Sequence, residues 1–343
     1  MSFHGATSTV SGSFPAMPYS VVRFNCIQPG LEPNEMAARY QAFVDMAGYA
    51  DEHDLQAISL EEHHGAESGW SPSPLVMAGL VFGRTQRIMA TINALLVPLH
   101  DPLRIAEDIA VLDLASGGRL IVTGGIGYRE SEYAAHGKDW SKRGALQDEA
   151  IDVMLKAWTG EPFEYRGTTV RVTPRPFTQP HPVLMLGGSS KVAVRRAARF
   201  GLPYMPPARL PELEAYYYEQ CAEYGTQGFC AMPPEHTAMT HVAEDPERVW
   251  RDFGHHFLHE AATYSSWQPE GQTSSVHSHA TTVAELRAEG IYEVVTPAEL
   301  VDRLRAKGPS ATCALHPLVG GMPIDEAWRS IRLYVEEVLP ALD

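Results

Sequence analysis

Short hydrophobic runs alternate along the chain with longer segments in which hydrophobic residues recur at helical spacing. The strand-like runs cover residues 19–27, 55–60, 88–97, 118–123, 181–186, 202–206, 238–243 and 311–318. The helical segments cover residues 36–47, 74–84, 103–115, 143–158, 191–200, 211–222 and 324–339. Strands that alternate with helices are typical of parallel sheets, and a closed barrel fits this pattern better than an open sheet. The pattern therefore predicts an α/β fold, a (β/α)8 TIM barrel with insertions.

Three segments depart from the repeat. Residues 1–17 are small and polar, so we predict a flexible N-terminal leader at 1–17 and a single barrel domain at 18–343. The alternating sequence TTVRV, at 168–172, predicts a small hairpin outside the repeat. Residues 244–283 break the rhythm of strands and helices, and we predict that they form a lid insertion.

Composition narrows the class of protein. The 343 residues are 44% hydrophobic, which is enough for a large core, and the net charge is −15. An acidic protein is a poor partner for nucleic acid or for an anionic membrane, because both attract basic surfaces. The N-terminus lacks a basic segment followed by an apolar one, and no apolar run reaches the length of about 18 residues that a membrane helix needs. We therefore predict a cytoplasmic protein that binds neither nucleic acid nor membrane.

Candidate chemistry gathers after the predicted strands, where a parallel barrel places its active site. Glu61, Glu62, His63 and His64 follow the second strand. A histidine can donate or accept a proton near neutral pH, and the adjacent acids could orient or charge it. The alternative is a pair of histidines held by hydrogen bonds in a loop.

The sequence GGSS closes the fifth strand and opens a helix, with Gly187, Gly188, Ser189 and Ser190. Free N–H groups at a helix start attract an anion, and glycine lets a phosphate approach closely. Arg143, at the start of another helix, could bind the same phosphate. The alternatives are an ordinary helix cap at the serines and a surface arginine.

Two further groups lie in predicted loops or in the insertion. The run of glycines around Gly125, followed by Tyr128, leaves room for a flat ring system at the barrel mouth, although turn formation would also explain it. His255 and His259 would share a helix face, with His256 beside them. A third metal ligand is not evident, so we predict a lid segment with exposed histidines and no metal site.

Five stretches, in this order, resemble the bacterial-luciferase-like monooxygenase superfamily: LEEHHG, VPLHDPLRIAEDIAVLDLASGGRL, GGIGYRESEYAAHG, RGALQDEA and PVLMLGGSSKVAVRRAARFGLP. The resemblance implies a flavin in the barrel mouth. It places His63 at the position of the catalytic histidine of luciferase, and Asn93 and Ala94 at a non-proline cis peptide that packs against the flavin ring. Gly125 falls where luciferase has a cysteine near the reactive carbon of that ring.

The same resemblance matches Ser190 and Arg143, with Ser189 beside them, to phosphate ligands of FMN. A phosphate-binding arginine of luciferase aligns here with Ile126. We therefore predict that Tyr128 or Arg129 takes over its role.

The resemblance implies a two-component monooxygenase. Reduced FMN from a separate flavin reductase would react with O2 and oxygenate a small organic substrate, with His63 in an acid/base role and the insertion excluding water. The alternative is an F420-dependent oxidoreductase that transfers hydride to or from a small organic substrate, since related branches use that deazaflavin. A third possibility is a flavin-storing relative without activity. The family likeness also implies a homodimer formed through the early barrel helices.

Overall fold

The computed structural model describes residues 18–234, 238–269, 274 and 276–342, so the predicted leader at 1–17 lies outside the described residues. The described chain forms a nine-stranded sheet and a separate two-stranded hairpin. The strands of the large sheet are β1 (Tyr19–Arg23), β2 (Ala57–Leu60), β3 (Met89–Leu96), β4 (Leu120–Gly125), β7 (Val183–Gly187), β8 (Tyr204–Met205), β9 (Met239–Val242), β10 (Tyr292–Val295) and β11 (Thr312–Leu315).

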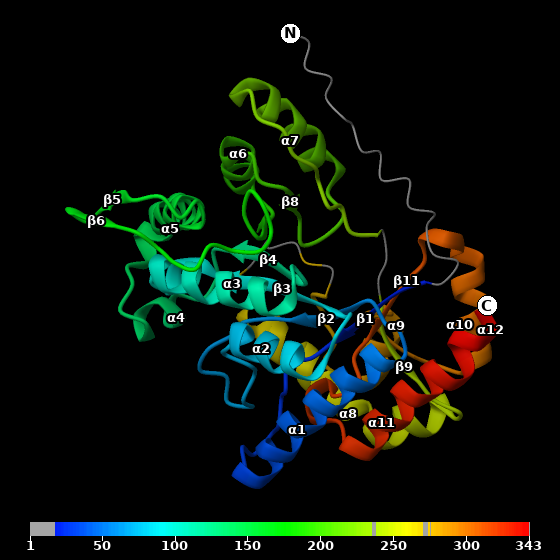
Figure 1. The fold of residues 1–343 in the computed structure, drawn as a ribbon. Coiled ribbons are helices and arrows are strands. Elements are labelled where there is room, and N and C mark those ends of the chain that lie inside the picture. The colour runs from blue at the N-terminus through cyan, green and yellow to red at the C-terminus, as the bar shows by residue number, and fades with distance from the viewer. Residues whose placement is uncertain (1–17, 235–237, 270–273, 275, 343) are drawn as a thin grey trace.

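The helices follow the strands along the chain and lie outside the curved sheet (Figure 1). They are α1 (Pro33–Glu52), α2 (Pro74–Arg84), α3 (Pro102–Ser116), α4 (Glu130–Ala135), α5 (Arg143–Trp158), α6 (Lys191–Phe200), α7 (Pro211–Tyr224), α8 (Pro246–Trp267), α9 (Val283–Glu289), α10 (Pro297–Lys307), α11 (Ile324–Leu333) and α12 (Leu339–Leu342). α3 shows how the sequence sets their limits. The Asp101 carboxylate caps its first turn, and Gly117 ends it in a left-handed conformation that favours glycine.

The strands of the large sheet pair in parallel, in the order β10-β9-β11-β1-β2-β3-β4-β7-β8. β1 lies between β2 and β11, with Val21 opposite Ala57 of β2 on one side and Ala314 of β11 on the other. The predicted α/β fold with a parallel sheet is confirmed. The predicted hairpin is also present, as β5 (Phe163–Tyr165) and β6 (Thr168–Val170), which pair antiparallel.

The structure adds elements that the sequence pattern did not predict. β10 follows α9 and precedes α10, and none of the three was expected. The signals were present as two capping boxes, in which Thr282 pairs with Glu285 and Thr296 with Glu299 at the starts of α9 and α10. The segment predicted as a lid, 244–283, begins with the 22-residue helix α8.

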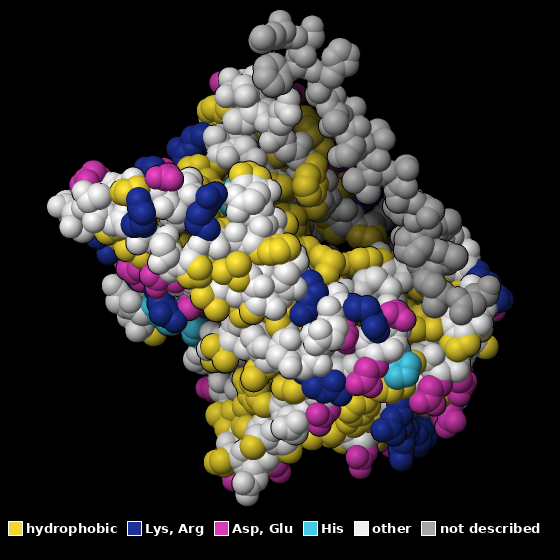
Figure 2. Space-filling view, in the orientation of Figure 1, with side chains coloured by type: hydrophobic (Ala, Val, Ile, Leu, Met, Phe, Trp, Pro, Cys, Tyr) yellow, Lys and Arg dark blue, Asp and Glu magenta, His cyan; other side chains and the backbone are white. Residues whose placement is uncertain are grey.

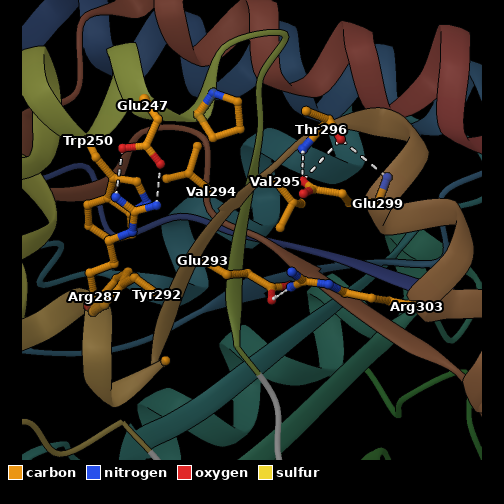
Figure 3. Close-up of a pocket in the computed structure, with 12 residues that line it drawn as sticks. Glu247, Trp250, Arg287, Tyr292, Glu293, Val294, Val295, Thr296, Glu299 and Arg303 are labelled. Carbon is orange, nitrogen blue, oxygen red and sulfur yellow. Dashed lines mark hydrogen bonds and ion pairs between the residues drawn. The ribbon is translucent and has the colours of Figure 1, made fainter.

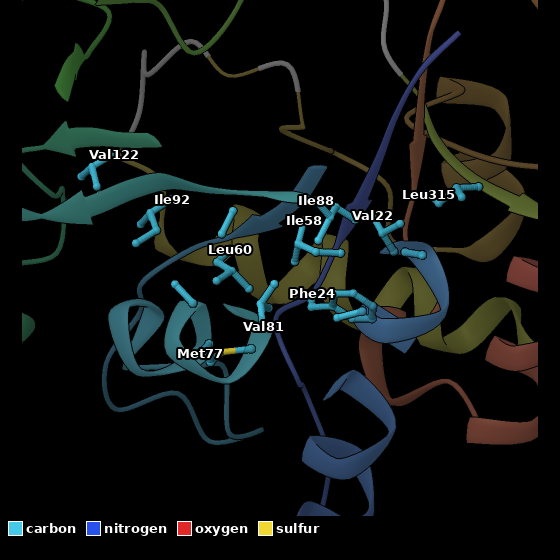
Figure 4. Close-up of a cluster of buried hydrophobic side chains, with 14 of the residues drawn as sticks. Val22, Phe24, Ile58, Leu60, Met77, Val81, Ile88, Ile92, Val122 and Leu315 are labelled. Atoms are coloured by element: carbon cyan, nitrogen blue, oxygen red, sulfur yellow. The ribbon is translucent and has the colours of Figure 1, made fainter. Parts of the chain in front are cut away.

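The hydrophobic core lies between the sheet and its surrounding helices (Figure 4). Val22, Ile58 and Val122 come from strands, while Met77 and Val81 of α2 pack against them, and all are at least 98% buried. Burial of such side chains contributes about 1.5–3 kcal/mol each. The core therefore fixes the strands whose carboxyl ends carry the polar groups described below.

α8 is anchored over one half of the sheet's carboxyl edge by a buried carboxylate. Glu260 is fully buried and accepts hydrogen bonds from Arg23 (2.8 Å), Asn25 (2.8 Å), His316 (2.9 Å) and Tyr292 (3.1 Å). These partners come from β10 and from the carboxyl ends of β1 and β11. Burial alone would raise the pKa of Glu260, but His316 and Arg23 lower it well below its usual range.

None of the described helices is long and apolar enough to cross a membrane. On the face shown in Figure 2, acidic and basic side chains are interspersed over the helices, with hydrophobic side chains between them. The negative net charge is therefore not concentrated into one acidic patch on that face.

We expect Glu260→Ala to destabilise the protein by about 3–5 kcal/mol, because the change leaves Arg23 and His316 buried without their counter-ion. Urea unfolding at neutral pH measures the effect. Glu247→Ala on the same helix is the matched control, since the Glu247–Arg287 pair is exposed and its loss should change stability little. Equal stabilities of wild type and Glu260→Ala would show that the buried network does not anchor α8.

Candidate active site

One cavity of about 840 Å³ lies at the carboxyl ends of β2, β3, β4, β7 and β8. All ten residues predicted for the site line it: His63, Asn93, Ala94, Gly125, Tyr128, Arg143, Gly187, Gly188, Ser189 and Ser190. The sequence rule that placed candidate chemistry after the strands therefore brought together residues that share one cavity.

The floor of the cavity is closely packed backbone. The Asn93–Ala94 peptide bond is cis, as the family resemblance implied. A Cβ at Gly125 would lie 2.9 Å from the Cβ of Ala94, and one at Gly187 would lie 3.1 Å from the Cγ2 of Thr123. A Cβ at Gly125 would collide with Ala94, and one at Gly187 would crowd Thr123, so the glycines keep side chains away from this part of the cavity.

The GGSS turn forms one end of the cavity, at the start of α6. Ser190 caps the helix by accepting a hydrogen bond from the N–H of Ala193 at 3.3 Å. Gly188 has φ +138°, and a Cβ there would lie 2.7 Å from the Cβ of Ala193, so the turn requires glycine. The exposed Ser189 and Ser190 and the free N–H groups of the first turn face an open space that suits an anion.

Two arginines line this end of the cavity. The Arg143 guanidinium stacks on Trp140 at 4.1 Å and donates to the Trp140 carbonyl at 3.1 Å. Arg196, which the sequence analysis missed, is buried and donates to Asp148 at 2.6 Å and to the Gly144 carbonyl at 3.3 Å. The sequence did offer a signal for Arg196, because it lies on the helix that begins at the GGSS motif and about two turns after that motif.

The prediction that Tyr128 or Arg129 replaces the arginine missing at Ile126 receives no support from the geometry. Arg129 does not line the cavity: it donates to the His64 carbonyl at 2.8 Å and to Glu132 at 3.0 Å. Tyr128 lies beside His63, with ring centroids 6.0 Å apart. Arg196 lies at the GGSS end instead, because α6 carries it there.

His63 occupies the other end of the cavity and is 6% exposed. Four aromatic rings surround its imidazole with centroids 5.0–6.0 Å away, those of Trp70, Tyr128, Tyr264 and Trp267. Tyr264 and Trp267 come from the last turn of α8 and were not predicted. Burial raises the pKa of Tyr128, so that this ring stays neutral.

The acids next to His63 in the sequence do not contact it. Glu61 accepts hydrogen bonds from Arg23 at 2.8 Å and from the Trp70 indole at 2.8 Å. Glu62 accepts hydrogen bonds from His64 at 2.9 Å and from His100 at 2.7 Å. The expectation that these acids orient or charge His63 is therefore wrong, because adjacent residues of this turn point to different partners.

Glu62 holds the end of β3 beside the cavity. Its second carboxylate oxygen accepts from the backbone N–H of Leu96 at 2.5 Å. Burial alone would raise the pKa of Glu62, but hydrogen bonds from His100, His64 and the Leu96 N–H lower it to about 2. The ionised carboxylate therefore ties the turn after β2 to β3.

The histidines of α8 lie outside the cavity. His255 is exposed, as expected, but His256 and His259 are half-buried. His256 contacts the Gly320 carbonyl at 3.0 Å through Nδ1. Among the described residues, no three His, Cys, Asp or Glu side chains are grouped as a metal site requires.

A second cavity, of about 590 Å³, lies along β10 (Figure 3). Its charged side chains pair with one another, Arg287 with Glu247 and Arg303 with Glu293. Glu299 accepts the capping hydrogen bonds of Thr296. These groups already satisfy each other, so the cavity that holds His63 is the better candidate for an active site.

The comparison with protein families agrees with this geometry. The model of the luciferase-like monooxygenase family matches residues 17–314. The chain belongs to this family. The family is one of oxidoreductases, and the cavity described above lies at the carboxyl ends of the strands, where parallel barrels carry their active sites.

Curated relatives match over part of their length. Protein y4wF of Sinorhizobium fredii is 31% identical over 173 residues, which are 49% of this chain and 51% of y4wF. The FMNH(2)-dependent dimethylsulfone monooxygenase of Pseudomonas putida is 27% identical over 156 residues, which are 43% of this chain and 42% of that enzyme. The chain thus spans about half the length of these relatives.

Solved structures match over nearly the whole chain. The monooxygenase RslO1 from Streptomyces bottropensis has a TM-score of 0.71 and 24% identity, covering 95% of this chain and 100% of its own. The FMN complex of the oxygenating constituent of 3,6-diketocamphane monooxygenase from Pseudomonas putida has a TM-score of 0.64 and 16% identity, covering 94% and 98%. An F420-dependent secondary alcohol dehydrogenase has the same TM-score and identity, covering 95% and 100%. At these identities the likeness shows a shared fold, the TIM barrel.

The buried Glu62 should make stability depend on pH in the acid range. Its pKa is about 2 in the folded protein, against an ordinary value of 4.5, so its stabilising effect is complete above about pH 4.5 and is lost as pH falls towards 2. We expect Glu62→Gln to lower stability at pH 7 by on the order of 3 kcal/mol, and the difference from wild type to shrink at pH 3. Denaturant unfolding at both pH values measures it, with the exposed Glu67→Gln as control. A difference of the same size at both pH values would contradict the assignment.

Proposed function

We propose that the protein is a monooxygenase that uses reduced FMN and O2 to oxygenate a small organic substrate, with His63 as its acid/base group. The observation that carries the proposal is that one cavity is lined by glycines at the ends of β4 and β7, by two arginines beside the GGSS turn and by His63. A flavin has the matching parts, a flat ring system and a phosphate on a side chain.

The residues present fit a flavin phosphate at the GGSS end. Ser189, Ser190 and the N–H groups of α6 supply hydrogen-bond donors, and Arg143 and Arg196 supply positive charge. Each of these groups comes from α5, α6 or the turn before α6, and Arg196 joins the two helices through its hydrogen bonds to Asp148 and the Gly144 carbonyl.

The floor formed by the Asn93–Ala94 bond, Gly125 and Gly187 would support the ring. Reduced flavin bound there would supply the activation of O2 and the transfer of one oxygen atom. Nδ1 of His63 is buried, so Nε2 is the ring nitrogen that can face the cavity. His63 would hold or move a proton at Nε2. The rings of Tyr264 and Trp267 would keep water from this end.

A second candidate is an F420-dependent oxidoreductase, with His63 as the proton partner of a hydride transfer. The similarity in fold to the F420-dependent secondary alcohol dehydrogenase favours it as much as the similarity to the FMN complex favours the first candidate. The same cationic end could hold a phosphate of either cofactor.

The monooxygenase reading requires partners. A separate flavin reductase would supply reduced FMN.

We also propose a homodimer formed through α2 and α3, which pack against each other. These helices expose Val76, Leu80, Val111 and Leu114, with between 41% and 65% of each residue accessible, and a second copy would cover this apolar stripe.

Anaerobic titration of the protein with reduced FMN, and separately with F420, tests the cofactor. We expect reduced FMN to bind and Arg143→Ala to weaken its binding by roughly 10-fold to 100-fold, because a charge-assisted hydrogen bond to the phosphate is lost. Lys142→Ala, which removes an exposed charge one residue away, should leave affinity unchanged. Tight binding of F420 with no detectable binding of FMN would reject the monooxygenase proposal.

Replacement of His63 tests the acid/base role. With reduced FMN supplied by a separate reductase, we expect His63→Ala to slow the formation of oxygenated product by about 100-fold or more, since proton transfer by a positioned side chain contributes that much. Mass spectrometry detects the added oxygen atom in each candidate substrate that wild type converts. Affinity for reduced FMN should stay within a few-fold of wild type. Unchanged product formation would remove His63 from the reaction.

A further inference from the structure

The buried nitrogen of His63 faces a carboxylate from a distant part of the chain. Nδ1 of His63 has no hydrogen-bond partner among the described residues and lies 3.8 Å from Oε1 of Glu132. That distance is too long for a hydrogen bond but short enough for an ion pair. The side chains of His63 and Glu132 are 8% and 2% exposed, so little water screens the contact.

The other groups in contact with the imidazole are four aromatic rings. Trp70 and Trp267 carry no titratable group, and the Trp70 N–H already donates to Glu61. Tyr264, from α8, and Tyr128, after β4, are phenols; burial raises the pKa of Tyr128 further. Glu132 is therefore the carboxylate that can determine which ring nitrogen of His63 carries the proton.

The two carboxylates nearest to His63 in the sequence, Glu61 and Glu62, bind other groups. Glu61 is paired with Arg23, and Glu62 accepts hydrogen bonds from His64 and His100. Each lies beside His63 in the sequence, but neither contacts its imidazole. The acid that does so is carried by α4.

Glu132 is held in place on both sides. Oε1 accepts from the backbone N–H of His64 at 3.0 Å and from Nη1 of Arg129 at 3.0 Å. The Arg129 guanidinium is itself fixed against the Trp267 ring at 4.3 Å. Burial alone would raise the pKa of Glu132, but the His63 ring, the His64 N–H and Arg129 lower it, so the carboxylate is ionised at neutral pH.

We propose that Glu132 is the positioning residue of His63: it keeps a proton on Nδ1, leaves Nε2 to face the cavity, and stabilises the ring when Nε2 gains a second proton. A carboxylate oxygen only accepts hydrogen bonds, so the neutral ring lies best with its N–H towards Glu132. The arrangement can be measured without cofactor, but its use in catalysis rests on the proposed function.

Nuclear magnetic resonance of the full-length protein labelled with 15N at its histidine side chains tests the proposal. We expect neutral His63 in wild type to carry its proton on Nδ1. In Glu132→Gln we expect the two neutral forms of the ring to become more equally populated, since the carboxylate that favours an N–H on the Nδ1 side is lost. Glu130→Gln is the matched control, because Glu130 lies on the same helix and is exposed.

The outcomes separate the two proposals. A neutral His63 protonated on Nε2 in wild type, or an unchanged Nδ1 preference in Glu132→Gln, would overturn the role of Glu132 whichever cofactor binds. Failure to bind reduced FMN would reject the proposed function and leave the histidine result standing. If Glu132→Gln does not fold, the wild-type spectrum alone decides, and Glu132→Asp should retain a smaller Nδ1 preference.

Discussion

Four of the buried carboxylates pair with groups at or after the carboxyl ends of the strands. They are Glu61, Glu62, Glu132 and Glu260. An unpaired charge at such depth costs several kcal/mol, so the positions of the donors decide how the surrounding elements are arranged. Glu260 joins α8 to β1 and β11, Glu62 joins the turn after β2 to β3, and Glu132 joins α4 to that same turn.

These pairings divide the edge of the sheet into two regions. Around Arg23 and His316 the groups are charged and fully engaged, which suits a structural support. Around Gly125 and Gly187 the edge is open and lined by backbone, which suits a flat ligand. His63 reaches the cavity, and its Nδ1 is turned towards Glu132 of α4. A histidine in that position can be charged or neutral without exposing its counter-ion to water.

The sequence predicted the parts of the site that depend on local signals. Glycine turns, a helix start and a histidine pair identify themselves by residue type and by position after a strand, and the family resemblance supplied the Asn93–Ala94 bond. Arg196, Tyr264 and Glu132 were missed for a different reason. Each is one polar or aromatic residue among several on a helix, and only the helix's orientation shows that Arg196 and Tyr264 line the cavity and that Glu132 faces His63.

In the EEHH motif, adjacency in the sequence wrongly predicted that Glu61 and Glu62 act on His63. Side chains that follow one another in an extended turn point in different directions, so Glu61 reaches Arg23, Glu62 reaches β3, and neither reaches His63. The strand β10 was missed because four residues between two short helices give little periodicity. In both cases the deciding contacts are between residues far apart in the chain.

The anchoring of α8 limits how the cavity can open. Its last turn carries Tyr264 and Trp267 to His63, so a lid that exposed His63 would have to move these two rings. Glu260 lies one turn earlier and is held by Arg23 and His316. Swinging the whole helix would separate these charges at a cost of about 3–5 kcal/mol. A movement confined to the last turn of α8, after Glu260, would leave this buried network intact.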